Sequence, residues 1–163
     1  TQSRSSAASD VYKRQALISI VSIVISGCAI TVNDLKNAQS SFDGSFTSQA
    51  DATDTYRTLR SMARQCLEYA AHLCSPVIVV SEFDGARKVG EINQKLLAEG
   101  LLINNALIEI ESHDGDKAKV NLYTTKSILS AGIKTPTISD LRRWADGDEN
   151  CNAPSYSTLR NWR

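Results

Sequence analysis

The sequence has no cluster of basic residues and no long apolar run. Its 18 Lys and Arg are balanced by 18 Asp and Glu, which gives a formal net charge of zero. Binding to nucleic-acid phosphates requires concentrated positive charge, so the composition argues against a nucleic-acid partner. The longest apolar run, residues 16–27, has 12 residues, whereas a membrane-spanning helix needs about 20. This run is therefore too short to cross a bilayer as a helix.

Sequence motifs that indicate catalysis or cofactor binding are also missing. The chain contains no GxSxG sequence, no glycine-rich phosphate loop and no CxxC pair. Its two histidines, His72 and His113, are not spaced with the cysteines as metal ligands would be. The DGD sequences at 114–116 and 146–148 lack the regular spacing of a calcium loop. We therefore predict no cofactor, no metal site and no enzymatic activity.

The N-terminal part of the chain has the layout of a secretory signal. Lys13 and Arg14 stand just before the apolar run at 16–27, which is the length of a signal-peptide h-region. Residues 1–15 contain no methionine, and we interpret them as an artefactual leader that plays no part in the fold. A buried β-strand is the structural alternative for 16–27, but the polar stretch after it offers no turn back to a core.

The apolar run ends in Ile25, Ser26, Gly27 and Cys28. This sequence resembles the lipobox of bacterial lipoproteins, which has an aliphatic residue, two small residues and a cysteine. The resemblance implies that Cys28 receives a diacylglyceryl group and that the chain is cut before it. The residue after the cysteine is Ala29 rather than Asp, which by the same resemblance implies sorting to the outer membrane. We expect a periplasm-facing protein whose contact with the membrane is the lipid anchor.

The remainder of the chain divides into a tether, a domain and a tail. Residues 28–52 are rich in Ser, Asn, Asp and Thr without an apolar period, which predicts a lipidated cysteine followed by a flexible tether. Residues 53–151 contain the helical and strand patterns and are predicted to form an α+β domain. The tail at 152–163 is expected to be irregular.

Hydrophobic periodicity predicts the elements of the domain. Apolar residues at helical spacing predict one helix over 53–73 and a second helix within 137–151, which is capped by Thr137 or Ser139 and ends at Asp146-Gly147. Four strands, separated in part by Asp-Gly turns, are predicted at 76–83, 87–96, 106–113 and 117–125. The spacing within the second of these segments would also suit a short helix. We expect an α+β fold: a four-stranded antiparallel meander packed against an N-terminal helix and a short C-terminal helix.

Three cysteines remain for disulfide formation once Cys28 carries a lipid. Cys66 and Cys74 would lie about 12 Å apart along a helix, whereas bridged Cα atoms lie within about 7 Å. Cys151 is therefore expected to pair with one of them, because disulfides persist in exported proteins. Cys66 is favoured, since it lies centrally on the buried helix face, and Cys74 is the alternative partner. Three free buried thiols are the other possibility.

His113 supports an alternative hypothesis from another functional class. It lies close to Asp114 and Asp116 in the sequence ESHDGD, which is compatible with a general base but also with a charged hairpin tip. Glu109 and Glu111 alternate with apolar residues, so we expect them on the solvent face of their strand. The alternative function is an envelope hydrolase, or a hydrolase accessory, that uses His113 and its acidic neighbours.

The lipobox, the sequences YRTLRSMARQC and LRRWADGDENC, and the predicted meander together resemble small uncharacterised lipoproteins of Gram-negative bacteria. The specific part of this resemblance is the lipobox, and it implies no known activity. We therefore expect a non-enzymatic lipoprotein whose domain binds an envelope protein or supports the envelope.

Overall fold

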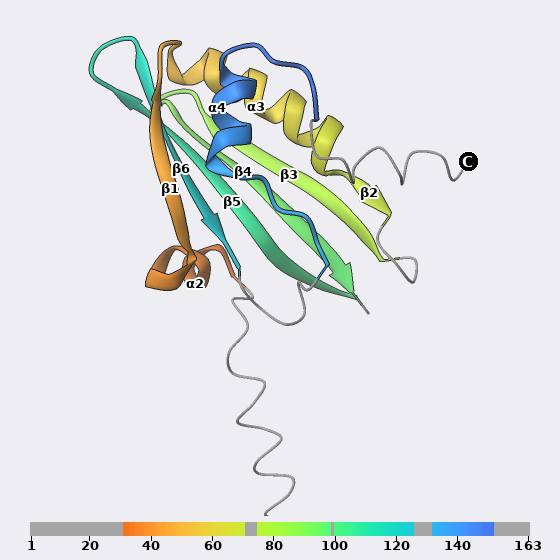
Figure 1. Ribbon diagram of the computed structural model, residues 1–163. Coiled ribbons are helices and arrows are strands. Elements are labelled where there is room, and N and C mark those ends of the chain that lie inside the picture. The colour runs from red at the N-terminus through yellow and green to blue at the C-terminus, as the bar shows by residue number, and fades with distance from the viewer. Residues whose placement is uncertain (1–30, 71–74, 99, 126–131, 152–163) are drawn as a thin grey trace, which may run out of the picture.

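One curled β-sheet organises the computed structural model, which describes residues 31–70, 75–98, 100–125 and 132–151. Its six strands are antiparallel in the order β1-β6-β5-β4-β3-β2, and the sheet curls like half of a barrel. The strands are β1 (Phe42–Ser48), β2 (Tyr69–Ala70), β3 (Pro76–Asp84), β4 (Val89–Ala98), β5 (Leu101–His113) and β6 (Lys117–Thr124). The described helices are α2 (Val32–Asn37), the short 3-10 helix η2 (Gln39–Ser41), α3 (Ala52–Leu67) and α4 (Ile138–Ala145). α3 and α4 lie on the same side of the sheet (Figure 1).

The predicted four-stranded meander is wrong, because two further strands extend the sheet at its edges. The four predicted strands exist as β3 to β6 in consecutive order, while β1 pairs with β6 and β2 pairs with β3. β1 has the sequence FDGSFTS and β2 has only two residues, so neither shows a strong strand pattern. Backbone hydrogen bonding to an existing neighbour makes these segments strands, and side-chain propensity contributes little.

The segment expected to be a flexible tether belongs largely to the fold. Residues 28–30 lie outside the described part of the chain, and from Thr31 onward the segment forms α2, η2 and β1. Leu35 of α2 and Phe46 of β1 are buried. A few buried side chains are enough to hold short elements against a sheet that the rest of the chain builds. Low hydrophobicity therefore gave the wrong expectation for this segment.

α3 is the long amphipathic helix that covers the concave side of the sheet. The Asp51 carboxylate caps its start by accepting the Asp54 N–H at 2.9 Å. The predicted helix over 53–73 is correct in position but ends at Leu67, because Glu68 is extended and leads into β2. The Glu68 carboxylate also accepts the N–H of Val79 at 3.2 Å, which ties the helix end to β3. The buried residues of α3 are Ala52, Thr55, Tyr56, Leu59, Met62, Ala63, Cys66 and Leu67.

Gly90 in β4 allows α3 to approach the sheet closely. It pairs with Phe83 of β3, and the Phe83 ring stacks on Tyr56 of α3 with centroids 4.8 Å apart. A Cβ atom on Gly90 would lie 2.6 Å from the Cδ2 atom of Tyr56. The missing side chain therefore makes room for the Tyr56 ring in the core.

The two predicted Asp-Gly turns close hairpins in different ways. Between β5 and β6, Asp114 and Gly115 have φ angles of 41° and 78°, so both adopt the positive φ that the sequence predicted. Between β3 and β4, the connection is longer and pairing resumes at Val89 opposite Asp84. In that turn the positive φ belongs to Lys88, at 53°. The strand predicted to begin at residue 87 therefore begins at Val89.

Candidate functional site

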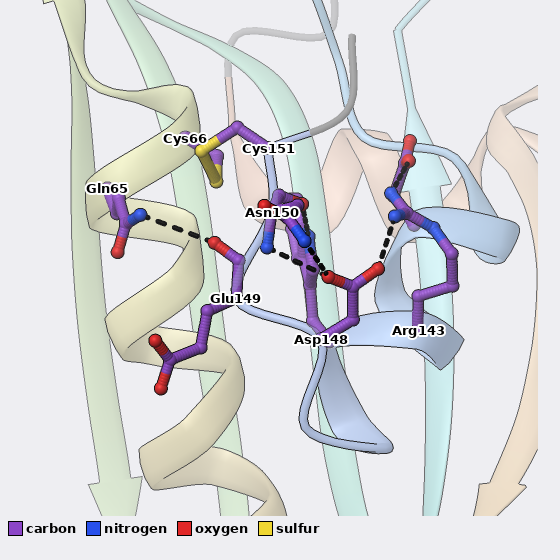
Figure 2. Close-up of a disulfide and its surroundings, with 9 residues drawn as sticks. Gln65, Cys66, Arg143, Asp148, Glu149, Asn150 and Cys151 are labelled. Carbon is purple, nitrogen blue, oxygen red and sulfur yellow. Dashed lines mark hydrogen bonds and ion pairs between the residues drawn. A yellow bond between two sulfur atoms is a disulfide. The ribbon is translucent and has the colours of Figure 1, made fainter.

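A disulfide joins the C-terminal part of the described chain to α3. Cys66 and Cys151 are bonded, with Cα atoms 5.2 Å apart (Figure 2). Of the two pairings that the sequence left open, this is the one present, and Cys74 lies outside the described residues. Beside the bridge, Gln65 Nε2 donates to the carbonyl oxygen of Glu149 at 3.4 Å. The bridge thus fixes the segment after α4 to the C-terminal end of α3, which ends at Leu67.

The turn after α4 presents the second cysteine to α3. Trp144 is buried, and its Nε1 donates to the carbonyl oxygen of Asn150 at 3.2 Å. The Asp148 carboxylate accepts the Asn150 N–H at 2.9 Å and Arg143 Nη1 at 2.6 Å (Figure 2). The hydrogen bonds from Asn150, with help from Arg143, hold the pKa of Asp148 below its usual value. Gly147, at φ 92°, supplies the chain reversal.

α2 holds the start of the described chain against the sheet. Thr31 and Asp34 form a capping box, in which the Asp34 N–H donates to Thr31 Oγ1 at 3.1 Å and the Thr31 N–H donates to Asp34 Oδ2 at 3.0 Å. Leu35 is completely buried. The position of Thr31, the first described residue, is therefore set by both its own helix cap and the packing of α2.

Lys36 of α2 joins two carboxylates on neighbouring strands. Its Nζ donates to Glu91 Oε1 at 2.7 Å and to Glu109 Oε1 at 2.6 Å. Glu91 and Glu109 are cross-strand partners in β4 and β5, where two like charges would otherwise repel. Because residues alternate along a strand, these carboxylates lie on the opposite side of the sheet from the core residues under α3. Lys36 therefore attaches α2 to the outer side of the sheet.

The electrostatics of this contact follow from partial burial and close charges. Burial lowers the pKa of Lys36, but the hydrogen bonds to Glu109 and Glu91 outweigh it, so the pKa lies above its ordinary value. Asn121 Nδ2 also donates to Glu109 Oε2 at 3.4 Å. Burial raises the pKa of Tyr123, and the negative charge of Glu109 raises it further. The ammonium of Lys36 is thus retained to high pH by the carboxylates it joins.

Exposed apolar side chains gather near one end of the sheet. Leu97, Leu101 and Leu102, at the tip of the β4–β5 hairpin, are 36%, 65% and 44% exposed. Phe42, the first residue of β1, is 51% exposed and packs edge-to-face on Tyr123 with centroids 5.6 Å apart. α2, the start of β1 and the β4–β5 tip all lie at this end (Figure 1). We call Leu97, Leu101 and Leu102 the leucine tip.

His113 lies at the other end of the sheet, where β5 turns into β6. Its side chain is 42% exposed, and its Nε2 lies 3.3 Å from Asp114 Oδ2. Nearby, Lys119 Nζ lies 3.4 Å from Glu111 Oε1 across the hairpin. Across residues 31–70, 75–98, 100–125 and 132–151, no three His, Cys, Asp or Glu side chains are grouped as metal ligands would be. The acidic neighbours of His113 therefore form a charged hairpin tip in this fold.

Glu109 is a residue whose role the sequence did not reveal. We expected it to face solvent with Glu111, but Glu109 receives Lys36 and Asn121 and contributes to the attachment of α2. Lys36 stands 73 residues away in the sequence, so no local pattern could have linked the two. The strand alternation did place Glu109 and Glu111 correctly on the side opposite the core.

The predicted anchor lies outside the described part of the chain. Ile25, Ser26, Gly27 and Cys28 all precede Thr31. Among the residues that the structure describes, no helix is long and apolar enough to cross a membrane. No protein-family model, curated protein or solved structure matches this chain. Its function must therefore be inferred from its own residues.

Proposed function

We propose that this chain is a lipoprotein anchored in the outer membrane through Cys28, with a non-enzymatic domain that faces the periplasm. The observation that carries the proposal is the sequence Ile25-Ser26-Gly27-Cys28, which ends three residues before Thr31, the first residue that the structure describes. An apolar segment with the length of a signal h-region precedes this motif. Cleavage before Cys28 would remove the leader and leave the folded domain intact.

The Cys66–Cys151 disulfide supports a location outside the cytoplasm. Disulfides form and persist in the bacterial periplasm, whereas cytosolic thiols are kept reduced. The two cysteines are separated by 85 residues and join α3 to the segment after α4. This long-range connection suits a structural bridge, since redox-active pairs are commonly the closely spaced CxxC type.

A binding or envelope-support role agrees best with the structural part that the charged side chains play in this fold. Lys36 with Glu91 and Glu109 attaches α2, and Arg143 with Asp148 stabilises the turn after α4. These contacts hold elements of the fold together. An anchored domain built in this way presents its surfaces to an envelope partner, and we assign it that role.

The anchor can be tested by lipid labelling in a Gram-negative host. The chain from Lys13 onward, with an initiator methionine, should incorporate labelled palmitate, and Cys28→Ser should abolish this incorporation and leave the leader uncleaved. Cys74→Ser is the matched control, because it removes a cysteine that the lipobox does not contain. Normal labelling of Cys28→Ser would refute the proposed anchor.

The outer-membrane location needs a separate test, because it depends on Ala29. After separation of inner and outer membranes by density, the acylated chain should appear in the outer-membrane fraction. Ala29→Asp should shift it to the inner membrane, if the sorting rule implied by the lipoprotein resemblance applies. An acylated wild-type chain found in the inner membrane would refute the location but leave the lipid anchor in place.

A further inference from the structure

We propose that the leucine tip of the β4–β5 hairpin rests in the surface of the phospholipid bilayer to which Cys28 is anchored. The inference rests on the proposed function, because the lipid on Cys28 sets where the membrane lies. It adds a second, non-covalent membrane contact and gives the domain a fixed orientation on the lipid. The occupant of this apolar surface is then the headgroup region and the upper acyl chains of the bilayer.

The short connection between anchor and fold limits how far the domain can stand from the membrane. Cys28 precedes Thr31 by three residues. A fully extended chain covers at most about 3.6 Å per residue, so Thr31 lies within about 11 Å of an acylated Cys28. That distance is about the thickness of one helix with its side chains, which is about 10–12 Å. The part of the domain next to Thr31 must therefore face the lipid closely.

Because α2 is fixed to the sheet, the short distance between Cys28 and Thr31 also limits how the sheet can be oriented on the membrane. Leu35 is completely buried, and Lys36 is held by the carboxylates of Glu91 and Glu109. α2 consequently cannot serve as a loose extension of the anchor. The end of the sheet at which α2 lies is the end that faces the bilayer, and this is where the leucine tip is found (Figure 1).

The leucine tip extends beyond the neighbouring strand. β5 starts at Leu101, but its pairing with β6 ends where Ala106 lies opposite Thr124. Because the Thr125 N–H still donates to the Asn105 carbonyl oxygen at 2.9 Å, four residues of β5, Leu101 to Asn104, extend past this pairing, which corresponds to about 14 Å at the usual rise per residue. Leu97 and Leu102 are cross-strand partners within this projection. The most exposed apolar side chains of the hairpin therefore lie in the part that extends past β6.

Most of the exposed large apolar side chains gather at the end of the sheet near α2, which also exposes the carboxylates of Asp34 and Asp43. At the end away from α2, the β3–β4 and β5–β6 turns expose the charged residues Asp84, Arg87, Lys88, Asp114 and Asp116. At the end near α2, Phe42 adds an exposed aromatic ring that packs on Tyr123. Exposed leucines with aromatic rings are suited to a membrane interface, whereas charged turns are suited to water.

Depth-dependent quenching in vesicles tests the orientation. The acylated, processed chain carrying Cys74→Ser and Leu101→Cys is labelled at residue 101 with an environment-sensitive fluorophore and placed in phosphatidylethanolamine/phosphatidylglycerol vesicles. Its emission should shift to shorter wavelength and lose intensity when lipids with a nitroxide near the headgroup are included. The same label on Asp116→Cys, an exposed position at the opposite end, should keep the emission of a water-exposed probe.

The outcomes separate the docking proposal from the anchor. Mass spectrometry shows whether Cys28 is acylated, and a chain without acyl groups would remove both proposals. An acylated, vesicle-bound chain whose label at 101 stays in water would overturn the docking and leave the anchor standing. Shielding of that label without nitroxide quenching, increasing with protein density, would identify a second copy of the chain as the occupant and would also overturn the docking.

A pair of aspartate variants tests whether the leucine side chains drive the contact. With the fluorophore on Leu97→Cys, the change Leu102→Asp should abolish nitroxide quenching. It replaces an apolar side chain of the tip with a carboxylate, and moving that charge from water into lipid is unfavourable. Val80→Asp is the matched control, since Val80 is also an exposed apolar residue but lies opposite Asn93 in the middle of β3. Val80→Asp should leave the quenching unchanged, and equal losses in both variants would overturn the assignment to the tip.

Discussion

Loss of the Cys66–Cys151 disulfide is expected to lower the free energy of unfolding by several kcal/mol. The cysteines are separated by 85 residues, and in the chain-entropy model a loop of this length is worth about 4.5 kcal/mol at 25 °C. Typical domains have about 5–15 kcal/mol of total stability, so the bridge accounts for a large share. Cys151→Ser is the best variant, because Cys151 is only partly buried and a serine hydroxyl can reach water there.

The effect should be spread over the whole domain. The hydrogen bonds of Trp144 and Asp148 within the turn after α4 do not need the bridge, so the turn can keep its local conformation. What the bridge restricts is the unfolded chain, in which α3 and this turn would otherwise separate. The variant should therefore unfold at lower denaturant concentration, and α3 and the sheet should lose structure together.

Urea unfolding followed by circular dichroism measures the difference. A reductant should lower the midpoint of the wild-type chain and of Cys74→Ser, but it should not change the midpoint of Cys151→Ser. Non-reducing peptide mapping should recover one linked peptide that contains Cys66 and Cys151. A peptide that links Cys74 to Cys151, or a wild-type midpoint insensitive to reductant, would refute the reasoning.

Three further perturbations test the packing, the turn and the attachment of α2. Gly90→Ala should destabilise the fold by about 1–3 kcal/mol, because the added methyl group would overpack against Tyr56. Gly85→Ala is the control: a Cβ atom there meets open space, so stability should change by less than about 0.5 kcal/mol. Equal melting temperatures for the two variants would contradict the close contact between Gly90 and Tyr56. Gly115→Val should cost about 1–2 kcal/mol because its φ is 78°, and unchanged thermal melting would mean that the turn is misplaced. Lys36→Met should cost about 2 kcal/mol, the value of hydrogen bonds to charged groups. Because the pKa of Lys36 in the folded chain is raised above 10.5, the stability that Lys36 contributes is complete below pH 10.5 and is lost as the pH rises through its pKa in the folded chain. If the wild-type chain stayed more stable than Lys36→Met well above that pKa, this assignment would be refuted.

Several features of this protein were determined by local sequence patterns. The periodicity around Tyr56, Leu59 and Ala63 predicted α3, since one apolar stripe is sufficient to mark a helix that covers a sheet. β3 to β6 were predicted because their alternating or β-branched residues match a surface that is buried on one side. Asp114 and Gly115 predicted a hairpin turn through their tolerance of positive φ. The motif that ends in Cys28 remains a prediction, and it is local as well.

Chain geometry narrowed the cysteine pairing without deciding it. The distance along a helix excluded a bond between Cys66 and Cys74, provided that the helix continued through both residues. α3 in fact ends at Leu67, so that argument did not hold for the chain as folded. The position of Cys66 on the buried face was the sounder reason, because the bridge is made from that face.

Tertiary structure decided the edges of the sheet and the place of the N-terminal segment. β1 has little strand propensity of its own and becomes a strand because β6 offers unpaired backbone groups to it. α2 is held by Leu35 and by the bond from Lys36 to Glu109, across 73 residues of sequence. Such contacts depend on the distance between residues in space, which local periodicity does not contain. For that reason the sequence predicted a flexible tether where the fold places a helix and an edge strand.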